Sequence, residues 1–310
     1  MKTHVVAVVG ATASGKSEFA VRLCEALGGE VVSCDSMQVY RGMNIGTAKP
    51  TAAEMRGVPH HLIDIADPAE PFSVADYVAA AEVAVRDIAA RGKLPVFCGG
   101  TGLYLDRFLF GGLTAETARD DALRQELFAL AEKHGNVFLH TKLCAVDPET
   151  AAAVHPNNVR RVVRALEIYR LTGVPKSEWD RRSQAAESRY FAAVVGVDRP
   201  RAELVERIDR RVDRMMAEGL LEETADLDAR GVFRRNATAA QAIGYKEILP
   251  CLRGTCSPEE AADALKIATR QYAKRQLTWF RAKPYVRWVS ASALSAADPA
   301  DLLRALFREE

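Results

Sequence analysis

The chain has 310 residues, of which 48% are hydrophobic and 27% are charged, and its formal net charge is +1. This composition is typical of a globular protein and excludes a disordered or collagen-like chain. No apolar run approaches the ~20 residues that a membrane helix needs, so we expect no membrane partner. Because the apolar run at 3–9 is predicted as a strand, we expect no signal peptide before it. We therefore expect a cytoplasmic protein.

The cysteines and the distribution of charge further limit the class of protein. The six cysteines are scattered and form no C-x-x-C pair, which argues against a zinc site or a disulfide framework and favours a reducing cytoplasm. Residues 1–155 hold 14 Lys and Arg against 19 Asp and Glu, whereas residues 156–287 hold 26 against 18. A basic second half favours a polyanionic partner, but a solvated helical surface with mixed charges explains it equally well.

The first hundred residues alternate between short apolar strands and amphipathic helices. Apolar, β-branched runs predict strands at 3–9, 30–35 and 94–102, and helical periodicity predicts helices at 15–27 and 74–91. This alternation implies right-handed crossovers and a parallel sheet, with ligands bound at the carboxyl ends of its strands. We expect the following residues to meet at that edge: Gly10–Ser17, Asp35 and Gly99–Gly102.

The rest of the chain is mostly helical and then returns to the sheet. Helical periodicity covers 120–134, 157–172, 200–229, 238–252 and 258–280. Residues 136–143 fit either a strand or a helix, whereas 190–198 and, more weakly, 285–290 fit strands. The predicted fold class is α/β, with a P-loop NTPase-like parallel sheet core formed by residues 1–112 and 188–310. A helical domain is inserted at 113–187.

Between the first strand and the first helix lies GATASGKS, which fits the phosphate-binding pattern G-x-x-x-x-G-K-S. In such a loop, backbone N–H groups and the start of a helix surround the oxygens of a di- or triphosphate. Lys16 would neutralise terminal oxygens and Ser17 would ligate Mg²⁺. The predicted diphosphate-binding residues are Gly10, Ala11, Thr12, Ala13, Ser14, Gly15, Lys16 and Ser17.

The loop alone does not identify its ligand. The chain shows no convincing Walker B strand, with four apolar residues that end in Asp and lead to a catalytic Glu, and no obvious base-recognition motif. Asp35, at the end of the second strand, is the nearest acidic partner, and small-molecule kinases also place an Asp there. From these residues alone, a kinase stays open as an alternative to other phosphate-dependent enzymes.

Seven segments together are more specific than the loop. They are GATASGKS, SCDSMQVYRGMNIGTAKPT (33–51), VPHHLIDIADPAEPFSVADY (58–77), GGTGLYLDRFLFG (99–111), HPNNVRRVVRALEIYRLTG (155–173), AIGYKEI (242–248) and ATRQYAKRQLTWFR (268–281). In this order, over residues 5–289, the chain closely resembles the tRNA dimethylallyltransferases, also called tRNA isopentenylpyrophosphate transferases. Ala11 stands where the family commonly has proline, which removes no functional group. The tail after residue 289 has no Cys or His, so the chain resembles the bacterial form, which lacks a zinc finger.

The resemblance implies a prenyl transfer. A dimethylallyl group would move from its diphosphate to the exocyclic N6 of adenine 37, beside the anticodon of certain tRNAs. The loop would hold the pyrophosphate leaving group while a C–O bond, not a P–O bond, breaks. The implied partners are dimethylallyl diphosphate and the tRNA anticodon stem-loop, with Mg²⁺ as cofactor and the protein as a monomer.

The resemblance also implies catalytic roles. An adenine amine is a poor nucleophile, so a carboxylate that accepts its proton assists it, and Asp35 is placed for this role. The alternative for Asp35 is a partner of Mg²⁺ or Ser17. Thr101 resembles the family's threonine where donor and base meet, with a local turn as the alternative. The family uses one arginine of the 200–229 helix at the pyrophosphate. Of Arg207 and Arg211, which share a helix face, we favour Arg211, although a surface salt bridge suits either equally.

Contacts with tRNA are implied in four groups of residues. Family members act on a flipped adenine, and this base and its neighbours would meet Asp35, Ser36, Met37, Gln38 and Thr101. The insertion would meet the tRNA backbone through Arg124, Arg160, Arg161, Val162, Val163 and Arg164. Gln241, Gly244, Tyr245 and Lys246 would also face RNA, and further candidate phosphate contacts are Arg270, Lys274 and Arg281. In segment 268–281, we expect the aromatic side chains to pack within the protein and not to stack on bases; these are Tyr272, Trp279 and Phe280.

Three other functions compete with this interpretation. An adenylate isopentenyltransferase uses the same donor on a free nucleotide and would not need the basic insertion. A P-loop small-molecule kinase would consume ATP and have no affinity for RNA. A non-enzymatic nucleic-acid binder would leave the arrangement of Gly15, Lys16 and Ser17 unexplained. We expect the adjacent His60 and His61 to be structural, because their spacing does not suit a metal.

Overall fold

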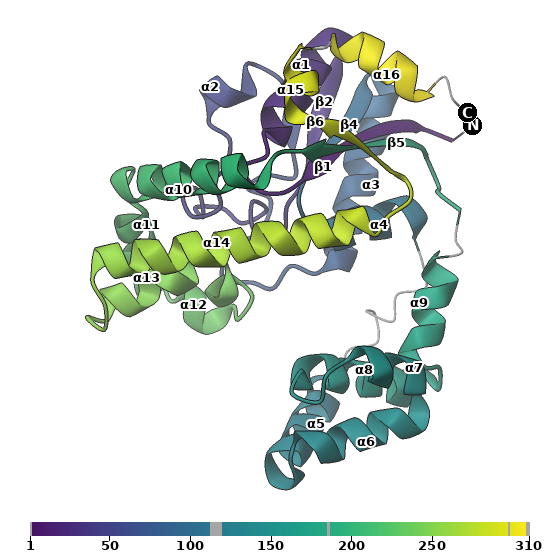
Figure 1. The fold of residues 1–310 in the computed structure, drawn as a ribbon, viewed down its shortest axis with the longest axis vertical. Helices are drawn as coiled ribbons and strands as arrows, with labels where there is room; N and C mark the ends of the chain where they lie inside the picture. The colour runs from purple at the N-terminus through teal and green to yellow at the C-terminus, as the bar shows by residue number, and fades with distance from the viewer. Residues whose placement is uncertain (1, 112–119, 185–186, 297, 308–310) are drawn as a thin grey trace. The chain divides into compact units, whose positions relative to one another are not determined.

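The computed structural model describes residues 2–111, 120–184, 187–296 and 298–307. The chain divides into two compact units, one formed by Met1–Phe108 with Tyr190–Glu310 and the other by Leu109–Arg189. The first unit is a sheet flanked by helices, and the second is a group of helices (Figure 1). No helix in the described stretches is both long enough and apolar enough to cross a membrane.

The first unit is built on a parallel sheet. Among the described residues, six strands lie in the order β3-β2-β4-β1-β5-β6, and every neighbouring pair is parallel. They are β1 (His4–Gly10), β2 (Gly29–Cys34), β3 (His60–His61), β4 (Leu94–Gly99), β5 (Phe191–Asp198) and β6 (Val286–Ser290). Strand β1 pairs with both β4 and β5 and is buried after its first residue, which explains its continuous apolar sequence. The predicted α/β class with a P-loop-like parallel sheet is confirmed.

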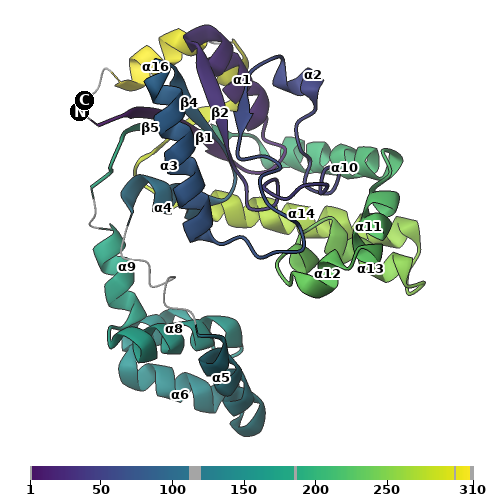
Figure 2. The ribbon, with the colours of Figure 1, turned by 180° about the vertical axis from the view of Figure 1, so that it is seen from behind.

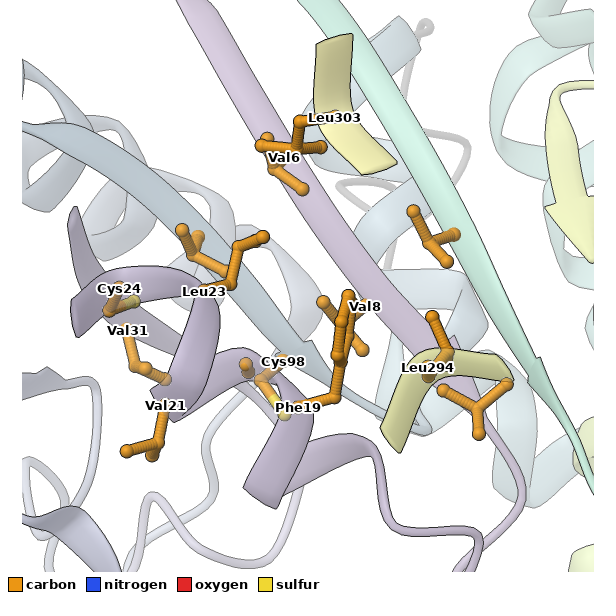
Figure 3. Packing of buried hydrophobic residues seen from close by; sticks show 14 of the residues in the cluster. Val6, Val8, Phe19, Val21, Leu23, Cys24, Val31, Cys98, Leu294 and Leu303 are labelled. Atoms are coloured by element: carbon orange, nitrogen blue, oxygen red, sulfur yellow. The ribbon is translucent and has the colours of Figure 1, made fainter. Parts of the chain in front are cut away.

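Helices cover both faces of this sheet. The helices of the first unit are α1 (Lys16–Leu27), α2 (Ala52–Met55), α3 (Val74–Ala90), α4 (Gly102–Phe110), α10 (Arg201–Ala217), α11 (Leu220–Ala229), α12 (Val232–Arg235), α13 (Tyr245–Leu252), α14 (Pro258–Arg281), α15 (Ala291–Ala296) and α16 (Pro299–Phe307), with a 3₁₀ turn η1 (Ala239–Gln241). On one face, α1, α15 and α16 pack against Val6 and Val8 of β1 (Figure 3). On the other face, beside α3 (Figure 2), Phe97 of β4 packs on Phe108 of α4 with 4.4 Å between ring centroids.

A second hydrophobic cluster joins the loop after β2 to the helices α10–α14. Its fully buried members include Val39, Tyr40, Met43, Leu220 and Tyr245. The Glu223 carboxylate of α11 accepts hydrogen bonds from the backbone N–H groups of residues 44–46 at 2.9–3.0 Å. The loop after β2 is therefore fixed by helices that come much later in the chain.

A buried carboxylate lies at the start of β2. Glu30 is 1% exposed, and its oxygens contact Arg91 at 2.8 Å, His61 at 2.7 Å and Lys93 at 3.0 Å. The hydrogen bonds from Arg91 first, and then those from His61 and Lys93, hold the pKa of this carboxyl well below its usual range. His61 thus supports the sheet, as expected for a structural pair.

The second unit has a hydrophobic core of its own. Its helices are α5 (Asp121–His134), α6 (Asn136–Val146), α7 (Pro148–Ala153), α8 (Val159–Thr172) and α9 (Lys176–Gln184). The residues at the centre of this core include Leu127, Leu139, Leu143 and Val162, all fully buried. The insertion was predicted at 113–187, and residue 113 lies outside the described residues. The predicted contact between this unit and tRNA stays a prediction.

Some elements differ in detail from those predicted. Residues 136–143, which fit either a strand or a helix, lie in α6. The predicted strand at 94–102 ends at Gly99, because α4 already begins at Gly102. The helix predicted at 200–229 is broken into α10 and α11 at Gly219, whose φ of 101° is incompatible with a right-handed helix. Strand β3 has only two residues, too few to give a periodic pattern.

Candidate active site

The phosphate-binding pattern forms a loop between β1 and α1. Gly10 and Gly15 have φ angles of 145° and 98°, and a Cβ at Gly10 would lie 3.1 Å from the Val197 carbonyl oxygen, so glycine is required there. Gly15 caps α1 without a side-chain hydrogen bond, which leaves the first N–H groups of the helix available to an anion. Lys16 Nζ donates to the Ala11 carbonyl at 3.1 Å, which holds the ammonium group beside the loop.

Helix α10 brings two arginines to the loop. Arg211 donates to the Thr12 hydroxyl at 3.2 Å, and Arg207 Nε donates to the Ala13 carbonyl at 2.8 Å. Ala13 has a φ of 63°, a backbone angle that residues other than glycine rarely adopt, so the hydrogen bond from Arg207 helps to hold a strained turn. The arginine favoured from the sequence and its alternative therefore both contact the loop, one through a side chain and the other through the backbone.

Arg199, just after β5, is a third arginine on the loop, and the sequence motifs did not single it out. Its Nε donates to the Ser14 carbonyl at 2.9 Å, and its guanidinium group also pairs with Glu203. The signal that could have found it is positional. A charged residue at the carboxyl end of a buried strand lies at the ligand-binding edge of a parallel sheet.

The cations of the loop lie in a partly buried environment. Burial lowers the pKa of Lys16 below its usual value, and Arg211 lowers it further, while the charge of Asp35 acts in the opposite direction. Burial also lowers the pKa of Arg211, as do its arginine neighbours on α10. Cations gathered in this way favour an anionic ligand, which would restore the charge balance. The loop is therefore suited to neutralise phosphate oxygens.

Ser17 is the predicted metal ligand. It is exposed at the start of α1, and its hydroxyl lies 3.9 Å from the Cys98 thiol. Burial raises the pKa of Cys98, so this thiol stays protonated and is a poor metal ligand. Among the described residues, no group of three or more His, Cys, Asp or Glu side chains could hold a metal ion. Mg²⁺ would therefore need phosphate oxygens and water besides Ser17, a donor set that suits this ion.

Strands β2 and β4 bring two predicted catalytic residues to the same edge of the sheet. Asp35 follows β2, and its Oδ1 accepts hydrogen bonds from the N–H groups of Met37 at 2.9 Å and Gln38 at 3.3 Å. Thr101 follows β4, and its hydroxyl accepts the N–H of Ser36 at 3.1 Å. Asp35 Oδ2 has no hydrogen bond to another described residue. This oxygen can therefore accept a proton from a substrate.

Helix α14 contributes two residues that the sequence did not assign to the site. Gln276 is 5% exposed, accepts the N–H of Thr12 at 2.8 Å and donates to the Gly100 carbonyl at 3.1 Å. Tyr272, one turn earlier and expected only to pack, has its hydroxyl beside the side chains of Thr101 and Gln276, which influence its pKa. The spacing of four residues places both on one helix face, but nothing in the sequence says which surface that face meets.

The segment 36–38, predicted to contact the target base, is held largely by the protein itself. The Gln38 side chain donates to the carbonyls of Thr47 and Ala48 at 3.3 and 3.2 Å, and it contacts the Ser33 hydroxyl at 3.1 Å. Ser36 and Met37 are half-buried. Contacts between this segment and tRNA stay predictions.

The arginines predicted to hold tRNA in the second unit fall into two groups. Arg124 and Arg164 bind the fully buried Glu167 carboxylate at 2.8 and 2.6 Å. The side chains of Arg160 and Arg161 are exposed and have no hydrogen bond or ion pair with another described residue. The second group is therefore better placed to meet a phosphate backbone.

Burial corrects three of the predicted tRNA contacts. Val162 and Val163 are at most 2% exposed, because they lie on the face of α8 that packs in the second unit's own core. Tyr245 is fully buried in the first unit, where its hydroxyl donates to Glu223 at 2.7 Å. None of these side chains can reach RNA in this conformation.

The remaining predicted contacts are mixed. Gln241 and Lys246 are exposed, whereas Gly244 is buried. Arg270 and Arg281 pair with carboxylates of the protein, Asp209 at 3.0 Å and Asp198 at 3.2 Å, which reduces their availability to phosphate. Lys274 is exposed, and its ammonium group forms no hydrogen bond or ion pair with a described residue.

The fold and the site together define a class of protein. A glycine-rich phosphate loop with converging cations stands at the same sheet edge as a carboxylate, in the manner of P-loop enzymes that act on phosphorylated substrates. Comparison with known proteins narrows this class. The profile of the family described as IPP transferase matches residues 38–283, and that described as isopentenyl transferase matches residues 3–67. The chain belongs to the IPP transferase family, whose members are prenyl-transferring enzymes.

Individual relatives agree with this family. The tRNA dimethylallyltransferase of Bacillus subtilis is 48% identical over 287 residues, which cover 93% of this chain and 90% of the relative. The crystal structure of the tRNA isopentenylpyrophosphate transferase from Bacillus halodurans superposes with a TM-score of 0.72 at 46% identity, covering 99% of this chain and 98% of that one. A eukaryotic dimethylallyltransferase acting on tRNA gives a TM-score of 0.80 at 31% identity, covering 98% and 77%. The resemblance inferred from the motifs is confirmed.

Proposed function

We propose that the protein transfers a dimethylallyl group from dimethylallyl diphosphate to N6 of adenine 37, beside the anticodon of tRNA. The observation that carries this proposal is the shared edge of β1, β2 and β4. There the loop holds Lys16 and Arg211 beside a predicted diphosphate, and Asp35 has an oxygen available for a proton. The relatives described above, named for the same transfer, support the donor and the acceptor.

The donor side requires stabilisation of a leaving group. When the allylic C–O bond breaks, its electron pair passes to the bridging oxygen of the diphosphate. Lys16, Arg211 and the N–H groups at the start of α1 can stabilise that developing charge. When bound at Ser17, Mg²⁺ would supply further positive charge to the diphosphate oxygens.

The acceptor side requires a base. The N6 lone pair forms the new C–N bond, and the proton that the amine loses passes to the unoccupied Oδ2 of Asp35. Thr101 holds Ser36 through its hydroxyl and so fixes the backbone beside that carboxylate. The carboxylate is thereby held in a fixed position for the amine, which a poor nucleophile needs.

The nucleic-acid partner is supported by exposed cations on both units. In the second unit, Arg160 and Arg161 of α8 are exposed and open to phosphate groups. In the first unit, Lys274 of α14 is exposed in the same way, and the exposed Lys246 of α13 has only its neighbour Glu247, at 3.6 Å, as an ion-pair partner among the described residues. A free adenylate acceptor would leave the two arginines without a role. We propose further that the enzyme works as a monomer in the cytoplasm, where its tRNA substrate is found.

The test is a direct assay of transfer. The protein is incubated with Mg²⁺, unmodified tRNA and dimethylallyl diphosphate labelled in its allylic carbon, and the tRNA is then digested to nucleosides. The expected result is label on one adenosine. A parallel reaction replaces tRNA with adenosine monophosphate, and another replaces the donor with ATP. Label on the free nucleotide alone would favour an adenylate isopentenyltransferase, and consumption of ATP with no use of the donor would favour a kinase.

A further inference from the structure

The side chain of Gln276 spans the gap between the two halves of the site. Its Oε1 accepts the N–H of Thr12 in the phosphate loop, and its Nε2 donates to the Gly100 carbonyl just before Thr101. It is 5% exposed, so both bonds are shielded from water. A Cβ at Gly100 would lie 1.8 Å from Gln276 Nε2, so residue 100 must be glycine for this contact to form.

Each end of this bridge continues into a residue with a proposed role. At the donor end, Thr12 is held a second time, through its hydroxyl, by Arg211. At the acceptor end, Thr101 follows Gly100, and its hydroxyl holds the N–H of Ser36 beside Asp35. An unbroken series of hydrogen bonds and adjacent residues therefore runs from the phosphate loop to the carboxylate.

Tyr272 lies beside the same bridge. Its hydroxyl is close enough to the Thr101 and Gln276 side chains for both to influence its pKa. Burial first, and then the charge of Asp35, raise the pKa of this hydroxyl, so it stays protonated and can act as a donor. The aromatic ring lies under Arg275, with 5.7 Å from the guanidinium carbon to the ring centroid. One face of α14 thus contacts both loops through side chains one turn apart.

We propose that Gln276 is a positioning residue that sets the separation between the diphosphate loop and the acceptor carboxylate. It touches neither substrate, and it acts through Thr12 on one side and through Gly100 and Thr101 on the other. This inference rests on the proposed function. The reacting carbon and nitrogen must approach within about 3–3.5 Å in line, and a displacement of ~1 Å in such geometry costs about 10²-fold in rate.

The test compares two variants that keep the shape of the side chains. Gln276→Glu keeps an acceptor for Thr12 but loses the donor to the Gly100 carbonyl, and Tyr272→Phe loses only its hydroxyl. The matched control is Thr278→Ala on the same helix, because the exposed Thr278 hydroxyl bonds only to the Lys274 carbonyl of α14 itself. Transfer is measured with labelled donor, alongside thermal unfolding and tRNA binding.

We expect Gln276→Glu to lower kcat about 10- to 100-fold. Tyr272→Phe should have a smaller effect in the same direction, and the control should match the wild type. The tRNA affinity should be unchanged in all three, and thermal unfolding should be unchanged in Tyr272→Phe and in the control. Gln276→Glu should lower the unfolding temperature, because the buried Gly100 carbonyl loses its donor, so its activity is expressed per folded molecule. Because Gln276 acts through Thr101, the double variant Gln276→Glu, Thr101→Val should be no slower than the slower single variant.

Three outcomes would overturn the inference. In the first, Gln276→Glu transfers the prenyl group at the rate of the control while the wild type is active. In the second, its defect disappears once activity is divided by the folded fraction, which would make the role purely structural. In the third, the decrease in kcat of the double variant equals the product of the decreases in the two single variants. If the wild type transfers no prenyl group at all, the proposed function itself fails, and this inference falls with it.

Discussion

Replacement of Asp35 by asparagine removes the proposed general base while the local fold is kept. The asparagine side chain keeps an Oδ1 that can accept the N–H groups of Met37 and Gln38, so the turn after β2 should persist. Only the second oxygen, which is open to a substrate, loses its basicity. The expected cost is therefore that of a general base, about 10²-fold or more in kcat, or roughly 2.7 kcal/mol or more in activation free energy.

The assay is single-turnover transfer of labelled prenyl group to tRNA at saturating substrates, with tRNA affinity measured separately. We expect the affinity to change little. The matched control is Asp298→Asn, because Asp298 Oδ1 accepts the N–H groups of Ala300 and Asp301 in the same manner, at 2.8 and 3.1 Å, at the start of α16. Turnover of the control should be normal.

Two results would refute this role for Asp35. Near-normal turnover of Asp35→Asn would move the base elsewhere, with a bound water as the next candidate. Recovery of turnover when Mg²⁺ is raised would show that Asp35 serves the metal rather than the amine.

Three further predictions concern charge. Lys16→Ala should lower kcat/KM by about 10²- to 10³-fold. In the wild type, the KM for the donor should rise at alkaline pH, because the lowered pKa of Lys16 makes its amine neutral at a lower pH than that of an ordinary lysine, whose pKa is ~10.4. A flat KM profile would contradict this. Arg160→Gln with Arg161→Gln should flatten the log–log salt dependence of tRNA binding by about 1.4–1.8 units, ~0.7–0.9 for each phosphate group that is no longer neutralised; an unchanged slope would remove α8 from the interface. Glu30→Gln should cost about 2 kcal/mol of unfolding free energy at neutral pH, below the usual ~3–5 because its cationic partners reach water. Since folding lowers the pKa of Glu30, the difference in unfolding free energy between the wild type and the variant should shrink as pH falls below ~4. Urea titrations at neutral and acid pH measure this difference, and equal values at both would contradict the prediction.

The parts of the site that the sequence predicted are those governed by local rules. Gly10 and Gly15 could be identified because the loop needs positive φ angles at fixed positions, and these occur in the structure. Asp35 and Thr101 could be placed near each other because both follow strands of a parallel sheet, whose carboxyl ends share an edge. In both cases the geometry follows from a few neighbouring residues or from a general property of the fold.

The parts that the sequence did not predict depend on packing between distant segments. Gln276 contacts Thr12 across 264 residues, and no periodicity in α14 says which loop its polar face will meet. Likewise, the basic pattern of α8 does not distinguish Arg164, which is paired with a buried glutamate, from Arg161, which is open. The buried glutamate, Glu167, decides between them, and only the packed unit shows where it lies.

The central claim is that the phosphate loop holds a leaving group whose C–O bond breaks. The most direct measurement uses dimethylallyl diphosphate with a heavy oxygen isotope at the bridge between carbon and phosphorus, followed by mass analysis of the diphosphate released with tRNA as acceptor. The account predicts that the heavy oxygen leaves entirely with the diphosphate, in an amount equal to the prenyl groups on tRNA. Heavy oxygen retained on the prenyl carbon, with unlabelled phosphate released, would show P–O cleavage and contradict it.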